Sequence, residues 1–329
     1  KLLFLMSKII FPFKITGYGS YLPEKIQTSK ELSSLIGKKE DWIISRTGVL
    51  ERRISDIDVD KMGAIAAKKA IGAKDKPDLI INASGVPKQT IPDTSVFIQR
   101  ELGFDGIPSF SVHSTCLSFI TALHVASNFL QTDLYEKILI VSSDRGTRGR
   151  NFKEPESAAL LGDAAGAVYL EKSDNNSGII SYTMNTFPDG VELTEVRGGG
   201  TNLHPQDKET LYSDNLFSMN GPRVYRMARQ KVYDLIKQDL LNNKLDVNDI
   251  DLVIPHQASG MAVKAYSKYG GFDKDKVIDI IDKTGNCVAA SIPLALNIAH
   301  QENKFKNGDI LYFVGTGAGL SIASCIFKV

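Results

Sequence analysis

Cys116 is the residue of this sequence best placed to act as a nucleophile. It lies in the stretch FSVHSTCLSFITALHVASNF, residues 110–129, where an apolar run gives way to residues with helical spacing. A thiolate at a helix N-terminus is stabilised by the helix dipole and by free backbone N–H groups. We therefore expect a reactive thiolate at Cys116. The competing interpretation is a small buried hydrophobic residue, because free cysteines are often buried.

Two polar residues further along the chain could assist this nucleophile. His256 stands in VIPHQASG, between a buried strand and a polar turn, where it could act as acid, base or hydrogen-bond donor. Asn286 stands in KTGNCVAAS, where its amide could donate to an oxygen that gains negative charge. Each also has a structural interpretation, His256 as a satisfied buried histidine and Asn286 as a turn or helix-cap residue.

The glycine-rich segment GTGAG, residues 315–319, joins two strand-like runs. A tight backbone lets N–H groups approach a reacting oxygen, so the N–H of Ala318 could form an oxyanion hole with the N–H of Cys116. A dinucleotide-binding interpretation is weak. That motif needs a following helix and an acidic residue about 20 positions on, and the chain ends first.

The elements that must position these residues alternate between β-rich and helical stretches, which is typical of an α/β fold. Runs such as ILIVSS and ILYFVG are apolar without alternation, as in strands that are covered on both faces. We expect strands over 14–19, 78–84, 109–113, 137–143, 164–172, 179–185, 251–256, 277–281, 310–315 and 319–328, and helices over 59–72, 94–102, 116–130, 221–241, 259–269 and 289–303.

Three segments of the first half recur in the same order in the second half. PDLIINASG echoes IDLVIPHQASG, EKILIVSSD echoes GDILYFVGT, and GDAAGAVYLEK echoes GTGAGLSIASC. The repetition indicates one duplicated unit. Cys116 and Asn286 then fall at matching turns, and the strand before His256 matches one that ends near Ala83. Packed about a pseudo-twofold axis, the three polar residues would meet at strand ends, where open α/β sheets bind ligands.

The bulk composition excludes several classes of function. The 329 residues carry 39 basic and 38 acidic side chains, so no net field favours nucleic acid. The three cysteines have neither metal-ligand nor disulfide spacing, which favours a reducing cytoplasm. The apolar opening KLLFLMSKIIFPFK is too short and too interrupted for a membrane span. We interpret residues 1–12 as a leader or extension, with Met6 a candidate native start, followed by halves 13–174 and 175–329.

In order and spacing, the Cys116 turn, PHQA, GNCVAAS and GTGAG resemble the β-ketoacyl-ACP synthase III family of the thiolase superfamily. The stretches GYGSYLPEKIQTSKELSSLIGKKEDWIISRTGVLERRI (17–54) and LLGDAAGAVYLEKS (160–173) are further signatures of that family. The resemblance covers the chain from about residue 13 to the end. It implies a thiolase-like five-layer αβαβα fold made of two duplicated halves, and a homodimer.

The resemblance also implies roles for the candidate residues. Cys116 would be acylated by an acyl thioester, and His256 and Asn286 would promote attack by a malonyl-type thioester through decarboxylation and oxyanion stabilisation. No metal and no permanently bound cofactor is implied, and acyl-CoA or acyl-ACP would be the substrate. Around the tunnel for the prosthetic arm, Trp42 would stack on the adenine of coenzyme A, Arg46 would meet phosphates, and Arg148 or Arg150 would clamp the adenine.

Departures from the family pattern concern the detailed activity. Cys116-Leu117-Ser118-Phe119 replaces the housekeeping Cys-x-Gly-Phe, and Ser259 stands where an asparagine usually positions the pantetheine arm. Ile91 occupies a place often held by phenylalanine at the wall of the acyl pocket that contacts the second subunit. We count Ser259, Ile91 and Phe119 among the substrate-binding residues. These departures indicate a specialised member and put the acetyl-CoA-priming role in doubt.

Three functions remain open. The leading hypothesis is a ketosynthase that joins the acyl group on Cys116 to a malonyl- or β-ketoacyl-type thioester, in the biosynthesis of fatty acids or of fatty-acid- or polyketide-derived metabolites. The first alternative is an acyltransferase onto a hydroxyl or amine, against which Asn286 speaks. The second is a non-catalytic ketosynthase-like partner subunit, against which the presence of all three residues speaks. The polar stretch 197–215 could cover the tunnel mouth.

Overall fold

The computed structural model describes residues 8–173 and 176–329. Met6, most of the expected leader and the expected boundary between the halves at residues 174 and 175 lie outside the described residues. The first strand begins at Phe11, so the last two residues of the expected leader already belong to the sheet. No helix in the two described ranges is long and apolar enough to cross a membrane.

The first half of the chain contains the strands and helices that lead up to and follow the nucleophile turn. They are β1 (Phe11–Tyr21), β2 (Ile26–Thr28), α1 (Ser29–Ile36), α2 (Glu40–Thr47), β3 (Glu51–Arg53), α3 (Val59–Ile71), β4 (Leu79–Asn82), α4 (Thr94–Leu102), β5 (Ser109–Ser111), the 3₁₀ turn η1 (Thr115–Leu117), α5 (Ser118–Phe129), β6 (Lys137–Arg145), α6 (Pro155–Leu160) and β7 (Asp163–Lys172).

The second half repeats this plan around one long helix. Its elements are β8 (Gly178–Thr186), β9 (Thr194–Glu195), β10 (Ser218–Met219), α7 (Gly221–Asn243), β11 (Leu252–Pro255), α8 (Gly260–Gly270), α9 (Ile281–Thr284), the 3₁₀ turn η7 (Val288–Ala290), α10 (Ser291–Gln301), β12 (Ile310–Gly317) and β13 (Ser321–Lys328). The long helix starts where Asn220 accepts a hydrogen bond from the N–H of Arg223 and where Pro222 occupies the first turn.

The strand pairing repeats between the halves. In the first half β4 is parallel to β6, which is antiparallel to β7, which is antiparallel to β1. In the second half β11, β12, β13 and β8 follow the same sequence of directions. The two sets join where Phe11 and Pro12 of β1 pair with β8, which gives one nine-stranded order, β11-β12-β13-β8-β1-β7-β6-β4-β5. The duplication expected from the sequence echoes is confirmed.

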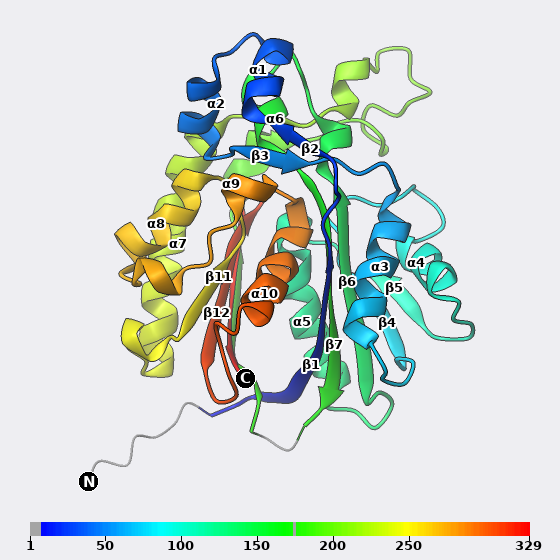
Figure 1. The fold of residues 1–329 in the computed structure, drawn as a ribbon, viewed down its shortest axis with the longest axis vertical. Helices are drawn as coiled ribbons and strands as arrows, with labels where there is room; N and C mark the ends of the chain where they lie inside the picture. Colours follow the sequence, from blue (N-terminus) through cyan, green and yellow to red (C-terminus); the bar gives the residue numbers. More distant parts are fainter. Residues whose placement is uncertain (1–7, 174–175) are drawn as a thin grey trace.

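Helices fill three layers around the two sets of strands (Figure 1). α3 and α4 cover the outer face of the first set, and α7 and α8 cover the outer face of the second. α5 and α10 lie between the sets, with contacts to strands of both halves. The order of layers is therefore helix, sheet, helix, sheet, helix, as expected for a thiolase-like fold.

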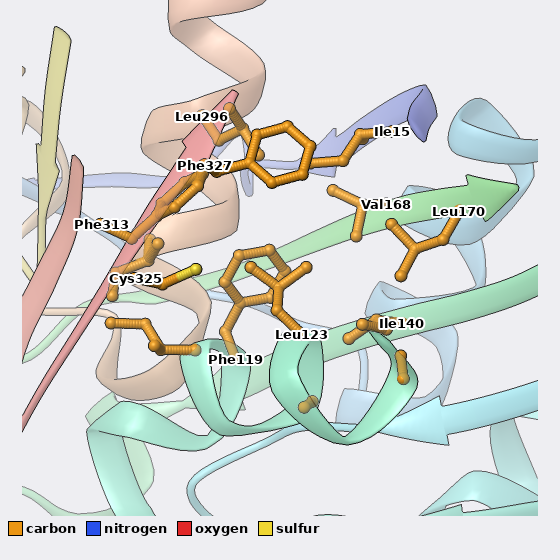
Figure 2. Close-up of a cluster of buried hydrophobic side chains, with 14 of the residues drawn as sticks. Ile15, Phe119, Leu123, Ile140, Val168, Leu170, Leu296, Phe313, Cys325 and Phe327 are labelled. Atoms are coloured by element: carbon orange, nitrogen blue, oxygen red, sulfur yellow. The ribbon is translucent and has the colours of Figure 1, made fainter. Parts of the chain in front are cut away.

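The largest core cluster lies around the central helix α5 (Figure 2). Phe119 and Leu123 of this helix point toward Phe313 and Phe327 of the second half, while Val168 lies on the side of the first half. The side chains of Phe119 and Leu123 are fully buried. This shared apolar layer holds the N-terminus of α5, and the turn η1 before it, in a fixed place between the two halves.

Several expected elements differ from those observed. The expected strand 277–281 is wrong, because Val277 forms only a single bridge to Val253 and α9 begins at Ile281. The expected helix 116–130 begins instead at Ser118, after the 3₁₀ turn that contains Cys116. The expected helix 289–303 is shortened in the same way to α10, after the matching turn η7.

Candidate active site

The nucleophile turn is held in an unusual backbone conformation. Thr115 has φ 50°, in the left-handed region that β-branched residues rarely adopt. Ser118 closes the turn, because its hydroxyl accepts a hydrogen bond from the N–H of Ser114 (2.9 Å) and donates one to the carbonyl of Thr115 (2.7 Å). Ser118 is fully buried. Its hydroxyl, a departure from the family pattern, therefore fixes the place of Cys116.

The thiol of Cys116 is not the stabilised thiolate that the sequence suggested. Burial, together with the negative charge of Asp144, raises the pKa of the Cys116 thiol to about 12. The expectation failed because the effect of a helix end is modest, whereas removing a thiolate from water is costly. At neutral pH the resting Cys116 is a neutral thiol, and its reaction requires a proton acceptor.

His256 is available as that acceptor. It follows β11, is 2% exposed, and its backbone N–H donates to the carbonyl of Val314 (2.8 Å). Burial lowers the pKa of His256 to about 4, so the imidazole is neutral at neutral pH. Among the described residues Nδ1 of His256 has no hydrogen-bond partner. A buried neutral imidazole with a free nitrogen can take up or donate a proton.

Gln257, which the sequence analysis overlooked, braces the turn that carries His256. Its side-chain nitrogen donates to the carbonyls of Pro255 and Ile278, each at 3.0 Å. Its side-chain oxygen accepts from the N–H of Ile280 at 3.0 Å. The amide is fully buried and serves three backbone groups, so it ties the end of β11 to the segment before α9.

Asn286 is held by both its backbone and its side chain. Its N–H donates to the carbonyl of Leu160 (2.9 Å), and its carbonyl accepts from the N–H of Gly162 (3.0 Å). The side-chain oxygen accepts from the N–H of Val288 (2.8 Å), and Nδ2 donates to the carbonyl of Ala258 (3.3 Å). The amide nitrogen is thus fixed next to the His256 turn, where it retains a second N–H to offer.

Two glycines of GTGAG, Gly315 and Gly317, allow the end of β12 to approach His256 and the turn that carries Cys116. A side-chain carbon at Gly315 would lie 2.7 Å from Cβ of His256, and one at Gly317 would lie 2.5 Å from Oγ1 of Thr115. Both distances are shorter than carbon and oxygen atoms tolerate, so only glycine fits. Ala318 follows Gly317 and lines the same cavity as Cys116, and the predicted oxyanion hole of their N–H groups stays a prediction.

One cavity of about 1030 Å³ brings the candidates together. Cys116, His256, Asn286 and Ala318 all line it. They come from η1, the end of β11, the turn before η7 and the end of β12, so both halves contribute. Cys116, His256 and Asn286, which the sequence analysis expects to meet at strand ends, therefore all line this cavity, and their catalytic roles stay a prediction.

The expected substrate-binding residues divide into two groups. Arg46, Arg148 and Ser259 line the cavity. Ser259 also caps α8, because its side chain accepts from the N–H of Ala262 (3.3 Å). The others are absent from the wall of the cavity; they are Trp42, Arg150, Ile91 and Phe119.

Each of these four has another environment. Phe119 belongs to the apolar core, and Trp42 packs partly buried beside α1 and α6, with the ammonium of Lys38 5.3 Å from its ring. Arg150 donates to the side chain of Gln27 at 2.6 Å. Ile91 is 80% exposed on the loop between β4 and α4, so its predicted place in a pocket depends on a second subunit.

Asp144 is a second residue that the sequence analysis overlooked. The carboxylate, fully buried at the end of β6, accepts from the N–H groups of Gly85 (2.9 Å) and Val86 (3.0 Å) through one oxygen, and from that of Ala290 (3.2 Å) through the other. Burial raises the pKa of Asp144 to about 7. The sequence did contain a signal for this residue, namely an acidic side chain at the end of the apolar run ILIVSS. A carboxylate buried at a strand end needs several hydrogen-bond donors.

Charged residues also line the same cavity. Arg226 and Arg229 of α7 join Arg46 and Arg148 there, and Glu156 is an acidic member of the wall. The ends of the polar stretch 197–215 contribute Gly198, Gly199 and Asn215 to the wall, and its predicted place at the tunnel mouth stays a prediction. Within the described ranges no three histidine, cysteine or acidic side chains are grouped so that they could hold a metal ion.

Comparisons with known proteins agree on one family. Residues 110–188 match the family model described as 3-oxoacyl-(acyl-carrier-protein) synthase III, and residues 240–329 match the model of its C terminal. The chain is 33% identical over 322 residues to the beta-ketoacyl-(acyl-carrier-protein) synthase III of Rickettsia bellii strain OSU 85-389, an alignment that covers 96% of this chain and 99% of that protein.

Solved structures extend the likeness to the whole fold. The 3-oxoacyl-(acyl-carrier-protein) synthase III of Aquifex aeolicus VF5 superposes with a TM-score of 0.88 at 28% identity, over 96% of this chain and 100% of that one. The priming β-ketosynthase of the R1128 polyketide biosynthetic pathway gives 0.88 at 26% identity, over 100% and 99%. On this likeness in sequence and fold, the chain belongs to the β-ketoacyl-(acyl-carrier-protein) synthase III family of the thiolase superfamily.

Proposed function

We propose that this protein is a condensing enzyme that forms a carbon–carbon bond between an acyl group on Cys116 and a malonyl- or β-ketoacyl-type thioester. The observation that carries the proposal is the single cavity lined by Cys116, His256 and Asn286. Family membership supports the reaction class, since the relatives named above are 3-oxoacyl and β-ketoacyl synthases.

The first half-reaction is acyl transfer to sulfur. The Cys116 thiol is neutral, so its proton passes to the neutral imidazole of His256 as sulfur attacks the thioester carbonyl. The carbonyl oxygen becomes an oxyanion, which the N–H groups of Cys116 and Ala318 stabilise. The carrier thiolate then leaves and recovers the proton, and the acyl group remains on Cys116.

The second half-reaction is the condensation. A malonyl thioester loses carbon dioxide and leaves an enolate. Its negatively charged thioester oxygen accepts hydrogen bonds from His256 and from the free N–H of Asn286. The carbanion attacks the acyl carbonyl on Cys116. Collapse of this second oxyanion releases a β-ketoacyl thioester and restores the thiolate, which takes up one proton.

The cavity supports a carrier-linked substrate. Arg46, Arg148 and Arg226 line it, and guanidinium groups pair with phosphate oxygens such as those of coenzyme A or of the phosphopantetheine arm of acyl carrier protein. Ser259 lies on the same wall and can meet the arm. Trp42 and Arg150 do not line the cavity, and their predicted contact with the adenine stays a prediction.

We also propose a homodimer that works in the cytoplasm. β5 is an edge strand of the sheet, with Phe110 and Val112 only partly covered, and Ile91 on the neighbouring loop is 80% exposed. A second subunit on this face would cover all three side chains and could bring Ile91 to its cavity. The free state of all three cysteines supports a reducing compartment.

Ser118, Ser259 and Ile91 support a specialised rather than a housekeeping role. The rival acyltransferase function remains the second candidate, since the first half-reaction serves it equally. Asn286 favours condensation, because transfer to a hydroxyl or amine creates no enolate-like oxygen for its amide.

Product analysis separates these functions. The protein is incubated with acyl-CoA, with and without malonyl-ACP, and the products are identified by mass spectrometry. A β-ketoacyl-ACP together with carbon dioxide, formed only when malonyl-ACP is present, is the expected result. Esters or amides formed without malonyl-ACP would replace the proposal by the acyltransferase function, and the absence of any acyl-enzyme would favour a non-catalytic subunit.

A further inference from the structure

We propose that Asp144 is a positioning residue for condensation: its carboxylate holds the turn η7 in place, and this turn aims the side chain of Asn286 at the reacting oxygen. The inference rests on the proposed function, because it assumes that the amide of Asn286 stabilises an enolate. It goes beyond that function, because Asp144 is not part of the wall of the cavity and none of the steps above uses it.

The carboxylate of Asp144 joins two segments from opposite halves of the chain. Its Oδ1 accepts hydrogen bonds from the N–H groups of Gly85 (2.9 Å) and Val86 (3.0 Å), in the loop after β4. Its Oδ2 accepts from the N–H of Ala290 (3.2 Å), in η7. Asp144 is fully buried. A buried carboxylate is costly unless several donors satisfy it, so these groups hold one another in place.

The turn η7 in its own right fixes the side chain of Asn286. The side-chain oxygen of Asn286 accepts from the N–H of Val288, the first residue of η7, at 2.8 Å. Its Nδ2 donates one N–H to the carbonyl of Ala258 at 3.3 Å, and the second N–H remains for the substrate. An amide group is planar, so the direction of this second N–H depends on where η7 lies.

Val288 needs neighbours that keep η7 in its conformation. It has φ 52°, in the left-handed region that β-branched residues rarely adopt, and such a conformation persists only where surrounding contacts fix it. A side-chain carbon at Gly85 would lie 2.4 Å from Cγ1 of Val288, and one at Gly146 would lie 3.4 Å from Cγ2. Val288 thus packs on the residues that surround Asp144, and the bond from Ala290 to Asp144 holds the end of the same turn.

The two halves of the chain differ at the position of Asp144. In each half the N–H of the residue after the first parallel strand donates to the second, to the carbonyl of Val141 at 2.7 Å and to that of Val314 at 2.8 Å. Three residues further on stand Asp144 and Gly317. The turn η7 is closed by a carboxylate, whereas glycine offers the turn η1 no side chain that could compete for the N–H of Cys116. The difference matches the roles proposed for the two turns.

The test replaces Asp144 with asparagine, which has the same size but only one acceptor oxygen. That oxygen can keep both bonds to the loop after β4, and the amide nitrogen then faces the N–H of Ala290, donor against donor. We expect condensation to slow about tenfold, less than on loss of the Asn286 amide itself. Acylation should not slow, because it does not use Asn286 and because one cause of the raised pKa of the Cys116 thiol is removed.

Asp239→Asn is the matched control. Asp239 is a buried carboxylate that also accepts three hydrogen bonds, from the hydroxyls of Thr183, Tyr312 and Ser324, and it does not line the cavity. Intact-mass spectrometry gives the rate of acylation, and β-ketoacyl-ACP formation by acylated protein gives the rate of condensation. Both are measured at pH 8, above the pKa of about 7 that burial gives Asp144. The ratio of the two rates should fall in Asp144→Asn only, and an unchanged ratio there would overturn the inference.

A double-mutant cycle tests whether Asp144 acts through Asn286. In the Asn286→Ala background the amide that Asp144 positions is absent, so Asp144→Asn should slow condensation no further than Asn286→Ala alone. Losses that multiply in the double variant would show that Asp144 affects condensation by another route, and would contradict the positioning role.

Amide hydrogen exchange keeps this inference separate from the proposed function, because it requires no turnover. Peptides that contain residues 286–290 should exchange faster in Asp144→Asn than in the native protein, and peptides that contain residues 114–118 should not. Unchanged exchange in η7 would overturn the inference even if condensation is observed. Faster exchange in η7, together with a native protein that forms no β-ketoacyl product, would overturn the proposed function and leave the link between Asp144 and η7 supported.

Misfolding would be detected as a lowered unfolding temperature of Asp144→Asn relative to Asp239→Asn. In that case Asp144→Ser repeats the comparison, because a single short hydroxyl cannot reach both segments. The same selective loss of condensation is expected, and an equal loss of both half-reactions in a folded protein would refute the positioning role.

Discussion

The two halves of the molecule contain the same turn with different chemistry. In the first half Thr115 has φ 50° and Ser118 holds the turn from the start of α5; in the second half Val288 has φ 52° and Ser291 holds the turn from the start of α10. The residue after the left-handed position is Cys116 in one turn and the fully buried Ala289 in the other. Duplication supplied the backbone twice, and only one copy presents a nucleophile.

At the position two residues before Thr115 and Val288, it is the second half that contributes a candidate catalytic residue. Asn286 is 7% exposed and bonded on both sides of its amide, whereas the matching His113 is exposed, with Nε2 3.1 Å from the carbonyl of Gly85. Of these matched positions, the first half contributes Cys116 to the proposed reaction and the second half contributes Asn286. A site at the junction of duplicated halves can be asymmetric in chemistry while its scaffold stays symmetric.

The largest expected effect distinguishes the two cysteines near these turns, the partly exposed Cys116 and the buried Cys287. Cys116→Ala should abolish the acyl adduct seen by intact-mass spectrometry, because the attacking sulfur is gone. Cys287→Ala should keep the adduct, because Cys287 is fully buried and its thiol donates to the carbonyl of Thr284. We expect it to cost only about 1 kcal/mol of stability. An adduct that persists in Cys116→Ala would show that the nucleophile is misassigned.

The next effect concerns the matched positions before the turns. Asn286→Ala should lower the condensation rate by about 10²–10³, the usual cost of removing an oxyanion donor. Acylation of Cys116 should fall much less, because that step does not use the amide. His113→Ala should change condensation far less than Asn286→Ala. Separate rates for acylation and for β-ketoacyl formation check this, and similar losses in both variants would mean that His113 shares the catalytic role.

Asp144 joins the loop after β4 to the turn η7 and should make stability depend on pH. Its pKa is raised from 3.8 to about 7, so the folded state binds the proton more tightly than the unfolded chain does. This contribution is fully present below pH 3.8 and is lost as the pH rises to about 7. It amounts to about 4 kcal/mol.

Asp144→Asn cannot titrate, which makes it the matched variant. Urea unfolding between pH 4 and pH 8 should show the free energy of unfolding of the native protein falling relative to that of Asp144→Asn as the pH rises. A difference between the two proteins that stays constant across this range would mean that the Asp144 carboxyl keeps an ordinary pKa in the folded state.

The sequence predicted the members of the site better than their electrostatics. Apolar runs locate strand ends, and the echo between the halves places Cys116, His256 and Asn286 at equivalent ends, so their convergence followed. The pKa of Cys116 did not follow, because it depends on burial and on Asp144, which lies 28 residues away in sequence. The local sequence pattern does not predict how close two charged residues lie in the folded protein.

The segment 277–281 shows a second limit. Its residues, VIDII, have the composition of a strand, but the side chain of Gln257 bonds to the backbone of Ile278 and Ile280. A glutamine side chain has taken backbone groups that a neighbouring strand would pair, and only the bridge at Val277 remains. Phe119 was misjudged for a related reason, since nothing in the sequence tells which face of α5 meets the second half.

The smallest effect tests the two serines that hold the turns. Ser118 forms two hydrogen bonds, with the N–H of Ser114 and the carbonyl of Thr115, while Ser291 accepts one from the N–H of Cys287 at 3.1 Å. Ser291→Ala should cost about 1 kcal/mol of unfolding free energy, and Ser118→Ala about 1 kcal/mol more. Only Ser118→Ala should also slow acylation, because the turn that it loosens carries the nucleophile. Equal losses of stability with unchanged acylation in both would show that Thr115 keeps its left-handed conformation without the serine, held instead by β12 at Gly317.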